Sequence, residues 1–394
     1  MAALPTFSSA CSLPRSLTVP PARSRRSGFR CGSIFGDNED YYVDEPESAG
    51  DGFFFSGGKY SDGPSRSDEW FAQGKMVKAY PVYGGKGKAK DPVFGLTLGA
   101  GSQSEADLFR WFCVEAGSSL NPKVILVHGF PSQAYSYRKV LPVLSEDHHA
   151  IAFDWLGTLL QIQVPWNYCC FGFSDKPQPR YGFDYTLDAA EYVSALGSLV
   201  DVLVPDKFSL VVQGYFSPVV LKYASCHQEK LTDLVLINPP LMENHVKLPS
   251  SLALFSNFLL GLIISQDPLS ASDRALTSCG PYMMKEEDAM VYRRPYLTSG
   301  SSGFALNALS GAMKKELKAY VETMRTTLAS ETWKTRTTIC WGMRDRWLRY
   351  DGVEEFCKAS NHKLVELAMA GHHVQEDSGE ELGRIISQII NKRK

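Results

Sequence analysis

The sequence predicts an α/β fold, with a mostly parallel sheet that carries helices on both faces and a helical cap inserted between two strands. Three observations support this prediction. From about residue 76, short apolar segments alternate with segments of helical periodicity, as in parallel strands joined by crossover helices. About a hundred mostly helical residues then follow without a strand signal. The 394-residue chain is 44% hydrophobic and 21% charged, which suits a sizeable buried core.

The expected elements follow from hydrophobic periodicity and from helix start signals. Apolar runs predict strands over residues 108–115, 124–127, 150–154, 208–212, 231–238, 337–341 and 363–367. Helical patterns predict helices over residues 186–204, with Thr186 as the N-cap, over 218–227 and over 380–391. The core therefore comprises residues 76–240 and 331–394, and residues 241–330 form the cap between its two parts.

Charge and composition exclude several classes of function. Lys and Arg total 41 and Asp and Glu total 43, so no nucleic-acid partner is expected. No run reaches the ~18 apolar residues of a transmembrane helix. The longest apolar-rich run, residues 251–264, favours a buried or amphipathic helix over membrane contact, although peripheral contact stays open. The nine cysteines show no metal-binding spacing and indicate reduced thiols, so neither a metal nor a cofactor is expected.

The N-terminal region differs from the rest of the chain. Residues 1–36 contain five Arg and seven Ser but no Asp or Glu, which predicts an organelle transit peptide, with a disordered basic tail as the alternative. The opening Met-Ala-Ala and the Ser and Pro content resemble chloroplast leaders, so we expect a chloroplast location. Residues 37–75 are rich in Gly, Asp, Ser and Tyr and predict a flexible linker.

A His-Gly-Phe-Pro motif follows the buried strand over residues 124–127. Gly129 permits a tight turn after His128, and the backbone N–H of Phe130 can then point toward the carboxyl end of the sheet. Such a donor is suited to stabilising a developing oxyanion. The alternative is a structural turn with a core histidine.

Five motifs in order give the chain, from about residue 108 to 390, a resemblance to the α/β-hydrolase family, close to its haloalkane dehalogenase and epoxide hydrolase branch. The motifs are HGFP at 128–131, DWLG at 154–157 with FGFSDKP at 171–177, LVVQGYFSPVVLKYA at 210–224, WGMRD at 341–345 and AGHHVQED at 370–377. The resemblance implies a catalytic nucleophile, acid and base at the carboxyl ends of the strands. It specifies the fold more strongly than the activity.

The resemblance places the acid at Asp345 and the base at His372, with His373 as a less favoured neighbour. An Asp that accepts the imidazole N–H fixes the histidine tautomer, so we expect a hydrogen bond from Nδ1 of His372 to the Asp345 carboxylate. The structural alternatives are an ion pair of Asp345 with a neighbouring Arg and a capping or core role for His372.

The third member of the triad is missing from the motif. In the register that fits the strand and the following helix, Gly214 takes the nucleophile position and has no side chain that can attack. Tyr215 stands where dehalogenases carry a Trp that helps hold halide, which disfavours halide chemistry. Ser217 is a helical turn away, so we expect it to cap the helix rather than to replace the nucleophile.

Residues 158–170 interrupt the family motif between DWLG and FGFSDKP. They carry no charge and are mostly apolar, which is unusual for a surface loop. They represent either a true loop near the pocket mouth or, as we favour, the translated remnant of an unspliced or mispredicted intron.

These residues leave three functional hypotheses. In the first, a catalytically degenerate hydrolase fold binds a small apolar molecule or a partner in the cleft between cap and core. In the second, His372 and Asp345 activate water or abstract a proton, as in a hydrolase or lyase. In the third, the chain is a non-catalytic plastid scaffold.

Overall fold

The structure is a computed structural model that describes residues 64–81, 108–156, 172–174, 190–257, 259–298 and 301–392. All of these belong to one compact unit, Phe53–Lys394. The predicted transit peptide, most of the predicted linker, the inserted residues 158–170 and the predicted N-cap Thr186 lie outside the described residues.

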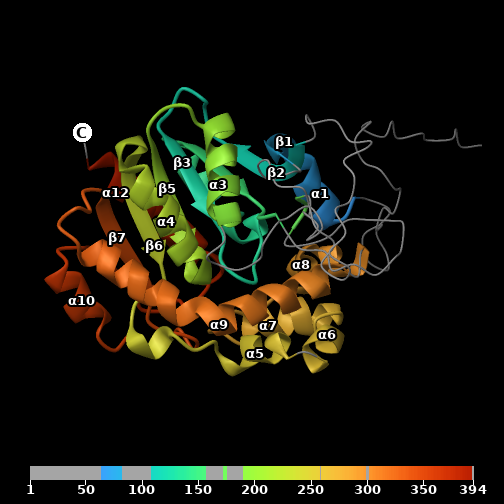
Figure 1. The fold of residues 1–394 in the computed structure, drawn as a ribbon. Helices are drawn as coiled ribbons and strands as arrows, with labels where there is room; N and C mark the ends of the chain where they lie inside the picture. The colour runs from blue at the N-terminus through green and yellow to red at the C-terminus, as the bar shows by residue number, and fades with distance from the viewer. Residues whose placement is uncertain are drawn as a thin grey trace, which may run out of the picture. The chain divides into compact units, whose positions relative to one another are not determined.

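An eight-stranded sheet forms the centre of the described fold, in the order β1-β2-β4-β3-β5-β6-β7-β8 (Figure 1). Six neighbouring strands from β4 to β8 are parallel, whereas β1 and β2 run antiparallel to their neighbours. The strands are β1 Gly74–Pro81, β2 Leu108–Ala116, β3 Lys123–Val127, β4 His149–Phe153, β5 Phe208–Gln213, β6 Leu231–Ile237, β7 Arg336–Gly342 and β8 Lys363–Leu367. The seven predicted strands and the mostly parallel α/β fold are confirmed.

The central parallel strands are mostly apolar because side chains on both faces of the sheet are buried there. In β3, Ile125 and Val127 point into one core cluster, and the alternate residues Val124 and Leu126 point into the other. Helices α3 (Ala190–Leu203) and α4 (Ser217–Cys226) cover the first face. Helices α2 (Leu141–Leu144) and α12 (Gly379–Asn391) cover the second face, and α10 (Val353–Ala359) lies beyond β7 (Figure 1).

The predicted linker over residues 37–75 is wrong at its C-terminal end. Helix α1 spans Arg66–Gln73 and leads directly into β1. A reciprocal capping box starts the helix, because Ser65 Oγ accepts from Asp68 N at 3.2 Å and Asp68 Oδ2 accepts from Ser65 N at 3.1 Å. Trp70 is buried against Phe112, so this segment belongs to the folded core.

The described residues between β6 and β7 form helices and turns, as the helical insertion predicts. The longer helices are α8 (Glu286–Thr298) and α9 (Ser301–Ala329), preceded by the short helices α5 (Ser250–Ala253), α6 (Leu260–Ile264) and α7 (Ala275–Thr277). Figure 1 shows them together at the lower edge of the view, beyond the sheet. The buried or amphipathic helix expected over residues 251–264 is not continuous, because α5, a 3-10 turn over Leu254–Ser256 and α6 divide that run. Leu252 is buried, whereas Leu254, Leu260 and Ile263 are exposed. Within the described ranges, no helix has the length and hydropathy to cross a membrane.

Candidate functional site

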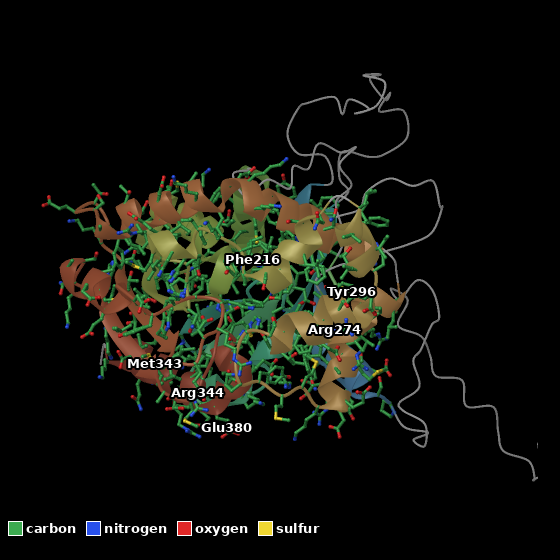
Figure 2. All side chains as sticks on the ribbon, turned by 90° about the horizontal axis from the view of Figure 1, so that it is seen from below. Phe216, Arg274, Tyr296, Met343, Arg344 and Glu380 are labelled. Carbon is green, nitrogen blue, oxygen red and sulfur yellow. The ribbon has the colours of Figure 1, made fainter. Side chains whose placement is uncertain are left out.

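The elbow after β5 is the first element of the site. The strand ends at Gln213, a short 3-10 turn covers Gly214–Phe216, and α4 begins at Ser217. Gly214 has a φ of 62°, in the left-handed region that glycine enters without a steric penalty. The ring of Phe216 stacks on Trp155 at 4.9 Å and so anchors the turn to the core. In Figure 2, the view from the side of the insertion helices, Phe216 lies near the centre.

Asp345 and His372 meet at the carboxyl ends of β7 and β8. Nδ1 of His372 lies 2.8 Å from Oδ2 of Asp345, and both side chains are buried. Oδ1 of Asp345 accepts the backbone N–H groups of Trp347 at 2.7 Å and Leu348 at 2.9 Å. These contacts, rather than an ion pair with a neighbouring arginine, hold the carboxylate. Because Nδ1 donates to Asp345, Nε2 of the neutral imidazole carries the lone pair.

Asn238 is a site residue that the sequence analysis missed. It follows β6, and its Nδ2 donates to Asp345 Oδ2 at 2.7 Å. Its Oδ1 accepts the Gly342 N–H at 2.8 Å, which fixes the orientation of the amide. A polar residue directly after the apolar run of β6, at the carboxyl edge of a parallel sheet, is the signal that could have indicated it.

The nearest neighbour of the elbow glycine is the histidine. A Cβ built on Gly214 would lie 2.8 Å from Nε2 of His372, closer than real Cβ contacts. Nε2 is buried and has no hydrogen-bond partner among the described residues. The structure therefore places the imidazole of His372 between Gly214 and Asp345.

The His-Gly-Phe-Pro turn connects the ends of two strands. His128 Nε2 accepts the Trp155 N–H at 3.2 Å, so its Nδ1 carries the proton and donates to the Gly129 carbonyl at 3.0 Å. Burial lowers the pKa of His128 to about 4, which keeps this ring neutral. The Ser132 N–H closes the turn on Gly129 O at 2.8 Å, and Phe130 is buried edge-on to Phe216. His128 thus acts as a structural tie, the alternative named above.

Several buried polar atoms at the elbow and beside His372 have no partner among the described residues. They are the Tyr215 hydroxyl, the Ser217 hydroxyl and both ring nitrogens of His373. Burial raises the pKa of Tyr215 well above its usual value and lowers that of His373 well below, so both groups are neutral. The expected capping role of Ser217 is wrong, because its hydroxyl makes no capping bond. Such atoms are available to a bound molecule.

Residues 278–281 of the helical insertion cover the loop that carries His372. The Cys279 carbonyl accepts the Arg346 N–H at 3.0 Å and the His372 N–H at 3.4 Å. Gly280 faces Gly371, and a Cβ on either would lie within 2.8 Å of the other's Cα. Residues 278–281 therefore help to bury His372, which is 0% exposed.

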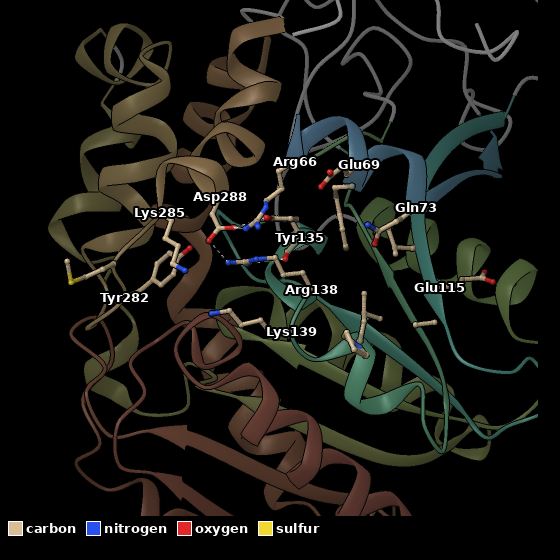
Figure 3. A pocket seen from close by; sticks show the side chains of 16 residues that line it. Arg66, Glu69, Gln73, Glu115, Tyr135, Arg138, Lys139, Tyr282, Lys285 and Asp288 are labelled. Carbon is tan, nitrogen blue, oxygen red and sulfur yellow. Dashed lines mark hydrogen bonds and ion pairs between the residues drawn. The ribbon is translucent and has the colours of Figure 1, made fainter. Parts of the chain in front are cut away.

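A separate cavity of about 590 Å³ lies between α1, α2 and the start of α8, and no residue of the His372 site lines it (Figure 3). Arg138 crosses it, with ion pairs to Asp288 at 2.9 Å and to Glu376 at 2.7 Å. Arg66 adds a pair to Asp288 at 3.0 Å. This network joins α1, the insertion and the core. Among the described residues, no three His, Cys, Asp or Glu side chains converge to hold a metal ion.

Hydrogen bonds to Asp154 connect the chain segments on either side of residues 157–171, which the structure does not describe. Asp154 Oδ1 accepts the Ala134 N–H and its Oδ2 accepts the Phe173 N–H, both at 2.7 Å. Its backbone carbonyl accepts the Ser174 hydroxyl, also at 2.7 Å. The chain therefore leaves at Leu156 and returns at Gly172 to the same place.

Comparisons with known proteins agree with this fold. The α/β hydrolase fold family matches residues 122–379. Cis-3-alkyl-4-alkyloxetan-2-one decarboxylase of Shewanella oneidensis is 26% identical over 272 residues, which cover 66% of this chain and 79% of that protein. Haloalkane dehalogenase 2 of Mycobacterium tuberculosis is 24% identical over 303 residues, which cover 72% of this chain and 94% of that protein.

The crystal structure of haloalkane dehalogenase DbeA from Bradyrhizobium elkani is similar in fold, with a TM-score of 0.59 at 20% identity. The match covers 72% of this chain and 94% of that one. The resemblance to dehalogenase relatives is thereby confirmed. With the family match covering more than half of its length and with a mostly parallel eight-stranded sheet, this chain belongs to the α/β-hydrolase fold family.

Proposed function

We propose that the chain is an α/β-hydrolase-fold protein without the covalent nucleophile of its family, which binds a small molecule noncovalently beside His372. Gly214 holds the elbow position and has no atom that can attack a substrate. The observation that carries the proposal is the 2.8 Å between a Cβ built on Gly214 and Nε2 of His372. A side chain at this position would therefore fit only if the imidazole or the turn shifted.

The chemistry around His372 supports a mainly apolar ligand with one polar group. The rings of Trp347 and Tyr215 flank the imidazole at 4.8 and 5.7 Å. Nε2 of His372 and the Tyr215 hydroxyl are buried without partners among the described residues. A buried polar group left unpaired costs about 1–3 kcal/mol, so a ligand hydroxyl or carbonyl at this place gains affinity by pairing with them.

Proton transfer by His372 is a second candidate function. The 2.8 Å contact with Asp345 supports it, because that contact fixes the tautomer and leaves the Nε2 lone pair available. In this version the imidazole takes a proton from water or from the bound molecule, and no covalent intermediate forms. Because Gly214 cannot form a covalent intermediate, we do not expect the chain to catalyse the reactions named for its relatives through one. The scaffold hypothesis, in contrast, predicts neither binding nor turnover.

Small probes of one shape test the binding proposal. Cyclohexanone and cyclohexanol carry one polar group, and cyclohexane carries none. Calorimetric titration of the full chain is expected to give tighter binding of the two polar probes, and His372→Ala is expected to weaken it roughly tenfold. Val202→Ser, on the exposed face of α3, is the matched control and should leave binding unchanged. Equal affinity for all three probes, or none in the wild type, would contradict the proposal.

A covalent probe tests the missing nucleophile separately. A fluorophosphonate directed at serine hydrolases is expected not to label residues 214–217 of the wild type. Stoichiometric labelling at Ser217 that Ser217→Ala abolishes would show that the nucleophile had been placed wrongly.

We also propose that residues 1–36 direct the chain to the chloroplast. Their Arg and Ser content and their lack of acidic residues support this. A fluorescent reporter fused behind residues 1–36 is expected to enter plastids in plant cells, and a reporter that stays in the cytosol would refute the proposal.

A further inference from the structure

The helical insertion presents a group of large apolar side chains to solvent. Leu259 and Ile263 are each 69% exposed, and Leu254, Leu260 and Leu269 are also exposed. We call these five side chains the apolar patch. Residues 248–266, which carry four of them, contain no Asp, Glu, Lys or Arg. Exposed apolar groups that gather in one place mark interaction sites, whereas single ones are ordinary surface.

The patch is held in place from its buried side. Leu252 and Phe255, on the same run of chain, are buried in the core cluster that includes α9. The Asn307 side chain of α9 donates to the carbonyls of Phe255 and Asn257, the latter at 3.0 Å. The run therefore has two apolar sides. One side is buried within this chain, and the other is exposed to solvent.

Two serine hydroxyls of residues 248–266 are paired within the run, whereas Gln266 Nε2 is buried without a partner among the described residues. The Ser256 hydroxyl donates to the Ala253 carbonyl at 2.6 Å, and the Ser265 hydroxyl donates to the Leu262 carbonyl at 3.2 Å. The hydrocarbon region of a bilayer offers no hydrogen-bond partner, so such internal pairing suits it. A protein partner would instead be expected to exchange about one hydrogen bond per 100–200 Å².

Lysines precede the charge-free run and stand on the helix that packs against it, and one acidic residue, Asp267, directly follows the run. Lys247 directly precedes the charge-free run, and Lys314, Lys315 and Lys318 are exposed on α9. Lys314 follows Asn307 by seven residues, two helical turns, and so lies on the side of α9 that faces the run. Lys318 continues the same side and has an exposed contact of 3.9 Å with Glu322. Apolar side chains beside lysines are the pattern of a surface that binds anionic headgroups.

We propose that the apolar patch docks the protein on the surface of a bilayer with anionic lipids. The leucines and Ile263 enter the upper acyl region, and the lysines meet the headgroups. The Ser278 hydroxyl donates to Ser251 Oγ at 3.0 Å, which connects α5 to the segment that closes the His372 site. Docking therefore places that segment beside the membrane. The docking does not depend on the proposed ligand function.

Fluorescence of an introduced tryptophan tests the insertion in the full chain. Ile263→Trp is expected to shift its emission to the blue on vesicles of phosphatidylglycerol and phosphatidylcholine, and to be quenched by brominated acyl chains. Val202→Trp, on α3, is the matched control and should show neither effect. This readout separates the patch from the Arg-rich N-terminal residues, which can also attract anionic vesicles.

Sedimentation with the same vesicles gives the affinity. Leu259→Ser with Ile263→Ser is expected to reduce binding roughly tenfold or more, as for the loss of two inserted aliphatic side chains. Leu120→Ser, at a 94% exposed position, should have no effect. An emission spectrum of the Ile263→Trp variant that does not change on vesicles would overturn the proposal. So would concentration-dependent self-association that the double variant abolishes, because a second copy would then cover the patch.

Discussion

The imidazole of His372 stands against the backbone of Gly214, where any other residue would carry its side chain. The Cβ of such a residue would lie 2.8 Å from Nε2. The ring cannot retreat freely, because its Nδ1 is held by Asp345 and Asp345 is held by Asn238 and two backbone N–H groups. Gly214 and the histidine position therefore depend on each other.

This relationship predicts the effect of Gly214→Ala. The new methyl group meets the imidazole, and an L-residue at a φ of 62° costs about 1–2 kcal/mol by itself. We expect a loss of about 2–4 kcal/mol in the free energy of unfolding, measured by urea denaturation. Gly311→Ala is the control, because a Cβ there meets nothing within 4 Å and lies inside α9. The control should be neutral or stabilising by up to about 1 kcal/mol. Equal losses in both variants would contradict the prediction.

The buried His128 predicts a pH dependence of stability. Its pKa is lowered to about 4 by burial, whereas an unfolded histidine titrates near its ordinary value of about 6.5. Between these values the unfolded chain binds a proton that the folded chain does not, so stability falls as the pH falls from about 6.5 to 4. The full contribution is roughly 3 kcal/mol. Urea denaturation at several pH values measures this slope.

Two variants identify the residue responsible. His128→Gln is expected to be less stable at pH 7 and to lose less stability on acidification than the wild type. Asp377 acts in the opposite direction, because burial raises its pKa to about 6 and so favours the folded state at lower pH. Asp377→Asn should therefore steepen the acid loss. An unchanged slope in His128→Gln would assign the effect to other groups.

The sheet could be predicted because its central parallel strands are buried on both faces and so form mostly apolar runs, as in β3 and β5. The same logic misses β1, an edge strand that mixes lysines with apolar residues. It also misses α1, whose Ser65 and Asp68 capping box lies among turn-forming residues.

The motifs that carry the site residues could be predicted from the sequence, but most contacts between those residues could not. Asp345 and His372 each follow a recognisable strand, and their hydrogen bond follows from that placement. The role of Asn238 depends on Asp345, 107 residues further along the chain, and no local pattern reports such a contact. The position of Nε2 against Gly214 is likewise set by packing, which spacing along the chain does not determine.

The contact between Gly280 and Gly371 predicts a way to open the site. A Cβ on residue 280 would lie 2.8 Å from the Gly371 Cα, so Gly280→Ala forces residues 278–281 away from the His372 loop. The buried Cys279 thiol beside it should then react roughly tenfold faster with a disulfide reagent, as mapped by mass spectrometry. Cys226 is exposed and serves as the internal reference. Unchanged reactivity at Cys279 would show that these residues do not close the site.

The position of Asp154 predicts that residues 158–170 can be removed. Asp154 receives hydrogen bonds from Ala134 on one side and from Phe173 and Ser174 on the other. The two flanks of the inserted residues are therefore already joined, and a deletion of 158–170 leaves these bonds in place. Shortening a loop changes closure entropy slowly, by about 0.6 kcal/mol for a twofold change in length. We expect the urea midpoint of the deletion variant to stay close to that of the wild type.

Asp154→Ala is the matched destabilising variant for this experiment. It removes a buried acceptor from two backbone N–H groups, which should cost about 2–4 kcal/mol, with or without residues 158–170. If the deletion alone cost as much as Asp154→Ala, the inserted residues would be part of the folded core. The interpretation as a translated intron remnant would then fail, because a chance insertion has no reason to contribute to the packing of the fold. A deletion that leaves stability unchanged is expected instead, and transcripts that lack the segment would give the same protein fold.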